Sequence, residues 1–188
     1  MKNRTTRKPK AAAAVVAAEP AANPWAWISA ASLAMALIAA FAVYWPAIHG
    51  PFLFDDIRLT YALPNAAYLP LKAWLNQTRP LLMFTFWLNY QQSAQETFGY
   101  HAVNVLLHFS NAIFVFLIAR RVLSWAGGEE WRNRVPALFA AGLFLLHPMQ
   151  TEAVSYIASR SETLSVFFVL AALAVYFGRK TATVSIPR

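Results

Sequence analysis

The sequence contains no cysteine in its 188 residues. Disulfide-stapled secreted modules and cysteine-based zinc sites both need this residue, so both classes are excluded. Charged residues are also scarce, at 13% of positions, whereas soluble globular domains carry about 25%. Apolar residues make up 59% of the chain, and the mean hydropathy is +0.42. Because the charges are too few to cover a water-exposed surface, the composition predicts an integral membrane protein.

Several motifs of soluble enzymes are also missing. The sequence has no glycine-rich phosphate loop, Walker lysine, H-E-x-x-H motif or G-x-S-x-G elbow, which excludes a soluble nucleotide-sugar fold. The net charge of +8 comes largely from five basic residues within the first ten positions. No basic stripe with interleaved aromatic residues follows them, so we expect no nucleic-acid partner.

Long apolar runs predict an all-α integral membrane fold with about four transmembrane helices. The expected spans lie near 25–45, 101–119, 135–147 and 162–178, within a membrane domain over 25–180. The first run would extend about 31 Å as a helix, which matches a bilayer core of about 30 Å. It is too long for the apolar core of a signal peptide and lacks a convincing cleavage site, which favours a retained anchor. Residues 1–24 are read as a basic cytoplasmic tail with an Ala/Pro linker, and 181–188 as a short cytoplasmic tail.

The placement of basic residues predicts the orientation. With the N-terminus in the cytoplasm, only Arg58, Lys72, Arg79 and Arg160 of the 16 basic residues lie on the outer side. This bias follows the positive-inside rule at every loop. We therefore expect a multi-pass protein of the bacterial inner membrane, in contact with membrane lipid, whose functional face is non-cytoplasmic.

The outer loop between the first two spans, 46–100, is long and hydrophobic. Tyr68, Leu71 and Leu75 share one side of a helix predicted over Ala66–Gln77, which suits a helix lying in the membrane interface. Residues 79–92 are apolar but too few for a comfortable span, so a second half-buried helix is expected. A lipid-facing lid without catalytic residues is the alternative for both segments.

An acidic pair, Asp55 and Asp56, follows the first span. Neighbouring side chains do not share a helix face, so the two carboxylates should have different tasks. One could face a reacting group while the other orients backbone, arginine or metal. The alternative is a helix-capping acid next to a solvated turn acid.

The second span carries a polar stripe on one helix face: His101, Asn104, His108 and Asn111. Polar groups are costly in lipid, so this stripe must face protein or water. For the three inner residues, hydrogen bonds between helices are the favoured interpretation. His101, which is nearest the outer surface, is the candidate site residue.

The segment that starts at His147 repeats this spacing with Glu152, Ser155, Ser159 and Glu162, which predicts that both acids share one helix face. Arg160 lies among them. Its planar guanidinium could hold a phosphate group. It could instead be neutralised by Glu152 or Glu162 in a structural cluster.

Four motifs occur in order: F-D-D at 54–56, R-P-L at 79–81, Y-H-A-V-N-V-L-L-H at 100–108 and H-P-M-Q-T-E-A-V-S-Y-I-A-S-R-S-E at 147–162. Together they resemble the transmembrane and tetratricopeptide-repeat family, whose members are O-mannosyltransferase-like proteins of the GT-C superfamily. The resemblance covers roughly residues 25–178, and it implies the N-terminal part of a GT-C fold.

The resemblance implies a membrane glycosyltransferase. Such an enzyme takes a sugar, for example mannose, from a polyprenyl-phosphate donor on the outer face and transfers it to a protein hydroxyl or another acceptor. Asp55 or Asp56 would deprotonate the acceptor, and Arg79, His147 and Arg160 would contact the donor phosphate or shape its pocket. The implied supporting residues are His101, Glu152 and Glu162. A lipid-linked sugar is the expected donor; a divalent metal is compatible with this reading but not indicated.

The chain departs from the family pattern because members have more spans, usually followed by helical repeats. We therefore expect a fragment or degenerate copy that has little transferase activity alone and works with further membrane helices. Two alternatives remain. One is a non-catalytic module that binds lipid-linked sugar or partner helices. The other is a small transporter along the polar stripe, although no charged residue lies at mid-membrane depth.

Overall fold

The computed structural model describes residues 26–127 and 129–179, and all regular elements in these two stretches are helical. The longer helices are α1 (Ala26–Ile48), α3 (Pro80–Ser93), α4 (Thr97–Trp125), α5 (Glu130–Leu146) and α7 (Arg160–Gly178). The shorter ones are α2 (Leu71–Leu75), α6 (Thr151–Ser155) and four 3-10 turns, η1 (Phe54–Arg58), η2 (Thr60–Ala62), η3 (Ala66–Tyr68) and η4 (Pro148–Gln150). The predicted tails and the Ala/Pro linker lie outside the described residues.

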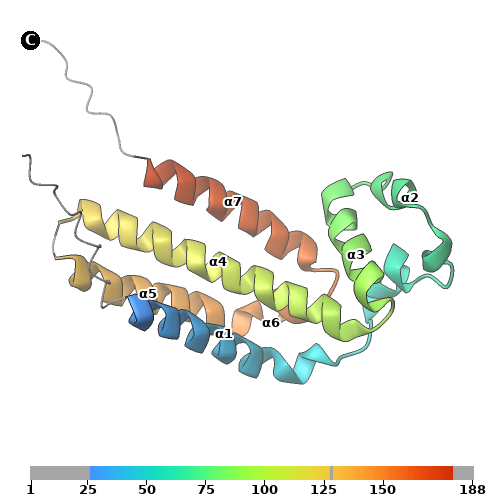
Figure 1. Ribbon diagram of the computed structural model, residues 1–188, viewed down its shortest axis with the longest axis horizontal. Helices are drawn as coiled ribbons and strands as arrows, with labels where there is room; N and C mark the ends of the chain where they lie inside the picture. The colour runs from blue at the N-terminus through green and yellow to red at the C-terminus, as the bar shows by residue number, and fades with distance from the viewer. Residues whose placement is uncertain (1–25, 128, 180–188) are drawn as a thin grey trace, which may run out of the picture.

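Four long helices run side by side along the molecule, with α4 at their centre (Figure 1). Helix α4 packs against α1, α5 and α7. The chain direction alternates from α1 to α4, α5 and α7, so the end of α1, the start of α4, the end of α5 and the start of α7 meet at one end. Helices α2 and α3 form a separate cap at that same end.

Three of the four long helices are long and apolar enough to cross a membrane: Ser29–Ile48 within α1, all of α4 and all of α7. Helix α5 has 17 residues, about 26 Å at 1.5 Å per residue, and packs along α4 as the fourth helix. The predicted all-α membrane fold is therefore confirmed. Helix α4 also continues past the expected end at Arg120 and Arg121 to Trp125.

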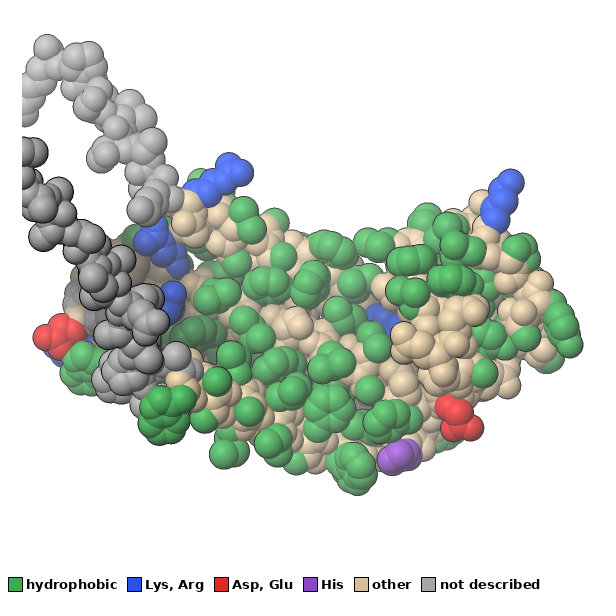
Figure 2. Space-filling model, in the orientation of Figure 1, with side chains coloured by type: hydrophobic (Ala, Val, Ile, Leu, Met, Phe, Trp, Pro, Cys, Tyr) green, Lys and Arg blue, Asp and Glu red, His purple; other side chains and the backbone are tan. Residues whose placement is uncertain are grey.

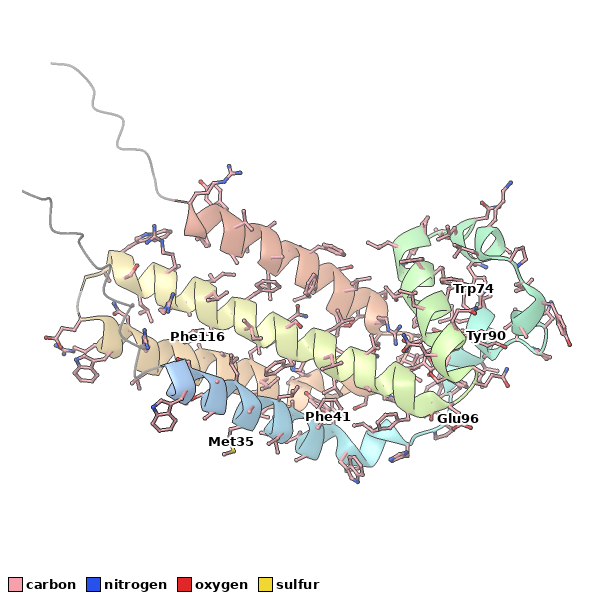
Figure 3. The ribbon with its side chains drawn as sticks, viewed as in Figure 1. Met35, Phe41, Trp74, Tyr90, Glu96 and Phe116 are labelled. Carbon is pink, nitrogen blue, oxygen red and sulfur yellow. The ribbon has the colours of Figure 1, made fainter. Side chains whose placement is uncertain are left out.

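The surface is consistent with a lipid environment. Hydrophobic side chains cover the middle of the face shown in Figure 2, whereas most Lys and Arg side chains visible there lie toward the two ends. Met35 on α1 points away from the helix bundle (Figure 3), with 68% of its surface exposed. Such broad exposed apolar surface is rare in water-soluble monomers, so the molecule is a membrane protein.

The polar stripe of α4 joins helices, as predicted for its three inner residues. The His108 Nε2 atom lies 3.1 Å from the carbonyl oxygen of Leu145 on α5, and Asn111 donates from Nδ2 to the carbonyl of Thr163 on α7 at 3.0 Å. Asn104 has the same role and is described with the site. Because both partners are buried in an apolar setting, these bonds fix how α5 and α7 sit on α4.

The end cap has its own core, which differs from the predicted arrangement. Trp74 of α2 packs against Tyr90 of α3 with ring centroids 5.6 Å apart (Figure 3). The single helix predicted over Ala66–Gln77 is wrong: only η3 and α2 form there, separated by Pro70. Proline cannot donate a backbone hydrogen bond, so α2 begins directly after it. Tyr68 consequently faces outward, with 87% of its surface exposed.

Candidate functional site

Asp56 is buried in the turn that follows α1. Three donors hold its carboxylate: Oδ1 accepts from the Tyr61 hydroxyl (3.1 Å) and the Ala158 backbone N–H (2.7 Å), and Oδ2 accepts from the Leu53 N–H (3.2 Å). Only 1% of the residue is exposed. These bonds satisfy both oxygens and tie residues 51–59, here called the aspartate loop, to the chain between α6 and α7. Asp56 therefore shapes the loop.

Asp55 is the exposed member of the pair. Its backbone N–H donates to the Tyr156 hydroxyl at 2.7 Å, while none of the described residues occupies its carboxylate with a hydrogen bond or an ion pair. A carboxylate that is fixed through its backbone but open at its oxygens can accept a proton from a bound molecule. The two neighbouring carboxylates thus have different surroundings: that of Asp56 is enclosed by donors, and that of Asp55 is open.

Phe54 precedes Asp55 in an unusual conformation. Its φ is 49°, in the left-handed region that non-glycine residues seldom adopt. The ring is 80% exposed and stands edge-on to Tyr156, with centroids 6.3 Å apart. An aromatic face and an open carboxylate therefore lie next to each other on the aspartate loop.

Residues 156–159, here called the connecting segment, contact the aspartate loop through two hydrogen bonds. Asn104 of α4 donates from Nδ2 to the carbonyls of Val154 (3.3 Å) and Tyr156 (3.1 Å). The segment then presents the Tyr156 hydroxyl and the Ala158 N–H to the two aspartates. Helix–helix hydrogen bonding by Asn104 is therefore confirmed, and it also positions the candidate site.

Arg160, the first residue of α7, is fully buried. Its Nε donates to Asn104 Oδ1 (2.8 Å), Nη2 to the Tyr100 carbonyl (2.9 Å) and Nη1 to Thr85 Oγ1 (3.4 Å). The guanidinium also lies over the Phe86 ring, 4.4 Å from its centroid. A desolvated cation–π contact contributes about 2 kcal/mol. Arg160 therefore joins α3, α4 and α7, and its donors are directed at protein groups.

The two acids proposed to neutralise Arg160 do not do so. Glu152 and Glu162 are both exposed, and none of the described carboxylates forms an ion pair with Arg160. The predicted common helix face for these acids is also wrong, because the chain leaves the helical path between Ser155 and Arg160. Backbone groups in this gap bond to Asn104 and Asp56 instead of to their own helix.

Tyr61 contributes to the site through its hydroxyl. Burial raises the pKa of the phenol far above its usual range, and the Asp56 carboxylate acts in the same direction. The hydroxyl thus keeps its proton and remains a donor to Asp56. The ring packs against Phe86 and Tyr100, with centroids 4.7 and 4.9 Å away. It therefore links the aspartate loop to the aromatic surroundings of Arg160.

His101 also lies close to the aspartate loop. Its side chain is buried, and Nε2 is 3.2 Å from the carbonyl oxygen of Gly50, just before the loop begins. His101 thus holds the chain where it leaves α1. This contact supports the loop without exposing the imidazole to a ligand.

The remaining candidates lie at the same end of the molecule but are exposed. Arg79 precedes α3, and His147 follows α5, where its Nδ1 accepts from the Met149 N–H at 3.2 Å. No hydrogen bond or ion pair among the described residues joins either side chain to an aspartate. Likewise, no three His, Asp or Glu side chains in the described ranges gather as metal ligands.

Sequence reasoning missed most partners of the buried groups. Tyr61, Tyr156 and Thr85 supply hydroxyls to Asp56, Asp55 and Arg160, but single hydroxyl residues within apolar segments carry no spacing signal. The clearest available signal is Arg160 itself, an arginine that precedes an apolar run and has no acid three or four residues away. Such a residue needs acceptors from elsewhere in the chain.

These observations define a helical membrane protein with an open carboxylate on a braced loop at one end of its helices. The Drosophila melanogaster protein O-mannosyl-transferase Tmtc1 is 34% identical over 160 residues, covering 76% of this chain and 18% of that protein. The Caenorhabditis elegans protein O-mannosyl-transferase F38B6.6 is 36% identical over 99 residues, covering 52% and 14%. The Mus musculus protein O-mannosyl-transferase TMTC3 is 30% identical over 153 residues, covering 72% and 15%.

The resemblance carried by the four motifs is thereby confirmed: the chain is related to the TMTC protein O-mannosyl-transferases. It spans less than a fifth of the length of these relatives. No family model matches the sequence. No solved structure matches it either.

Proposed function

We propose that the chain takes part in mannose transfer from a polyprenyl-phosphate donor to a hydroxyl group of a protein or other acceptor. The contrast between the two aspartates carries this proposal: Asp56 is enclosed by three donors, whereas Asp55 is exposed with free oxygens. The names of the relatives support mannose as the sugar and protein as the acceptor. The reaction would take place on the non-cytoplasmic face, where the proposed topology puts the aspartate loop.

In the proposed reaction, Asp55 accepts the proton of the acceptor hydroxyl. The acceptor oxygen then bonds to the anomeric carbon of mannose while the bond from that carbon to the phosphate oxygen breaks. Polyprenyl phosphate leaves with the electron pair. General base catalysis of this kind contributes roughly 100- to 10,000-fold to the rate.

A leaving phosphate at a membrane interface needs nearby cations. Arg79 and His147 are the candidates at this end whose side chains remain exposed. Arg160 already directs three donors at Asn104, Tyr100 and Thr85, which supports a bracing task for it instead of phosphate contact.

The test compares Asp55→Asn with Asp56→Asn in membranes that naturally contain the chain, so that any further helices it works with are present. With polyprenyl-phosphate mannose as donor, Asp55→Asn should lower transfer roughly 100-fold or more while leaving the melting temperature unchanged. Asp56→Asn should lower both transfer and melting temperature, because an amide cannot accept from three donors in the same way.

Glu96→Gln is the matched control, since Glu96 is an exposed acid at the same end of the molecule, at the turn between α3 and α4 (Figure 3). This variant should transfer mannose like the unaltered chain. Normal transfer by Asp55→Asn would refute the assignment of the base. Donor binding without any transfer by the unaltered chain would favour the non-catalytic lipid-binding module.

A further inference from the structure

A pocket of about 450 Å³ lies between α4, α5 and α7, at the opposite end of the helices from Asp56. Its polar lining consists of Arg120, Arg121, Ser124 and Asn133, and Ala174 and Gly178 of α7 leave it open because they are small. None of these residues contributes to the site described above.

The described partners of the two arginines are a backbone carbonyl and aromatic rings. The Arg121 Nε donates to the carbonyl of Phe177 at the end of α7 (2.8 Å), and its guanidinium lies 5.8 Å from the Trp125 ring centroid. The Arg120 guanidinium lies 5.7 Å from the Phe116 ring centroid. Among the side chains that the structure describes, neither arginine forms an ion pair with a carboxylate. Stacked in this way, both guanidinium groups still have N–H donors available for an anion.

The length of α4 is compatible with a pocket at the depth of lipid headgroups. The 24 residues from Thr97 to Arg120 extend about 36 Å as a helix, slightly more than a bilayer core of about 30 Å. Exposed apolar residues lie at the pocket itself: Leu117 lines it, and Val175 follows the lining residue Ala174 on α7. A bound phosphate would therefore lie next to apolar surface that suits acyl chains.

We propose that this pocket binds the phosphate of an anionic membrane lipid, with Arg120 and Arg121 as its principal ligands. Guanidinium groups match phosphate oxygens in geometry and charge, and the side-chain amide of Asn133 supplies a further donor on the α5 side. In the proposed topology this end faces the cytoplasm. The inference does not depend on the transferase assignment, because it uses neither aspartate.

The first experiment measures lipid binding to the full chain in neutral detergent by native mass spectrometry. The probes are phosphatidylglycerol, which is anionic, and phosphatidylcholine, which is zwitterionic. The double variant Arg120→Gln/Arg121→Gln should bind phosphatidylglycerol on the order of tenfold more weakly, as expected for losing two basic residues at a headgroup. Phosphatidylcholine binding should be unchanged.

The matched control removes the same charge at the same end of the molecule. Arg132 and Arg179 are exposed and do not line the pocket, so Arg132→Gln/Arg179→Gln should change phosphatidylglycerol binding less than twofold. An equal loss in both double variants would show a diffuse charge effect and would overturn the proposed site.

A second variant blocks the pocket without changing any charge. A side-chain atom added at Gly178 meets nothing within 4 Å, so Gly178→Leu should fold and fill the space between α4 and α7. Gly142 on α5 is equally open but lies in a different groove between α1, α4 and α5, whose lining is mostly apolar and includes Ser29, Ser32 and Arg134. Gly178→Leu should weaken phosphatidylglycerol binding, and Gly142→Leu should not.

Inorganic phosphate distinguishes a lipid from a free anion. If phosphate alone binds in the same pocket as tightly as phosphatidylglycerol does, the ligand is a soluble phosphate and the lipid assignment is wrong. If Gly178→Leu and the arginine variant both retain full phosphatidylglycerol preference, the pocket is not a binding site.

Discussion

Ala94 and Phe54 are the two non-glycine residues with positive φ in the described part of the chain, at 47° and 49°. At Phe54, bonds on both sides hold the conformation: Asp56 accepts from the Leu53 N–H, and the Asp55 N–H donates to Tyr156. Strain of this kind persists where surrounding contacts determine it, and it often accompanies functional sites. The bonds of Leu53 and Asp55 supply such contacts around Phe54.

Ala94 offers a test of backbone strain away from the aspartates. It follows α3, is exposed, and has no packing role that a glycine would remove. Because a side chain in this sparsely populated conformation (φ 47°, ψ −114°) is unfavourable by roughly 1–3 kcal/mol, Ala94→Gly should raise the melting temperature of the detergent-solubilised chain. Scanning fluorimetry would measure the change.

The control is Ala126→Gly, at the end of α4, where φ is −74° and glycine relieves nothing. This variant should be neutral or less stable, because glycine gains more freedom in the unfolded chain. A similar decrease in the melting temperature of both variants would show that the backbone at Ala94 is not strained.

At the scale of elements, Arg160 connects three helices. Lysine keeps the charge but loses the planar fork that reaches Asn104 and Tyr100 together. We expect Arg160→Lys to lower the free energy of unfolding by about 2–4 kcal/mol, since hydrogen bonds to charged groups contribute about 1.5–3 kcal/mol each. Thermal melting in detergent measures this effect.

The exposed Arg79 provides the comparison for that substitution. Arg79→Lys should leave the melting temperature unchanged, because surface charges contribute little to stability. Equal melting temperatures for Arg160→Lys and Arg79→Lys would show that Arg160 does not stabilise the contact between α3, α4 and α7. Arg160→Lys should lower the proposed mannose transfer only if the substitution displaces the aspartate loop.

The long helices were predictable because an apolar run of about 20 residues has few possible structures other than a membrane-spanning helix. The partners of the polar stripe on α4 were predictable for another reason: polar side chains in lipid must form hydrogen bonds with neighbouring helices. The break between α6 and α7 was not predictable, because it depends on bonds from Asn104 and Asp56, each about 50 to 100 residues away. The partners of Arg160 similarly come from α3 and α4, which no local spacing connects to it.

For the whole molecule, the absence of cysteine makes the topology directly testable. Ala67 lies at the aspartate end and Ala126 at the other end, and both are exposed. In intact cells, a membrane-impermeant maleimide should label Ala67→Cys, whereas Ala126→Cys should react only after permeabilisation. The reverse pattern would put the aspartate loop in the cytoplasm and would overturn the proposed donor and reaction face.

Helix α7 begins only two residues after Ala158, whose N–H holds Asp56. Its 19 residues extend about 29 Å, close to the thickness of a bilayer core. A thicker or thinner bilayer changes the tilt of such a helix. The first turn of α7 would then move Ala158 and, through its hydrogen bond, the Asp56 carboxylate. Lipid composition would then regulate the proposed reaction mechanically, through the peptide group of Ala158.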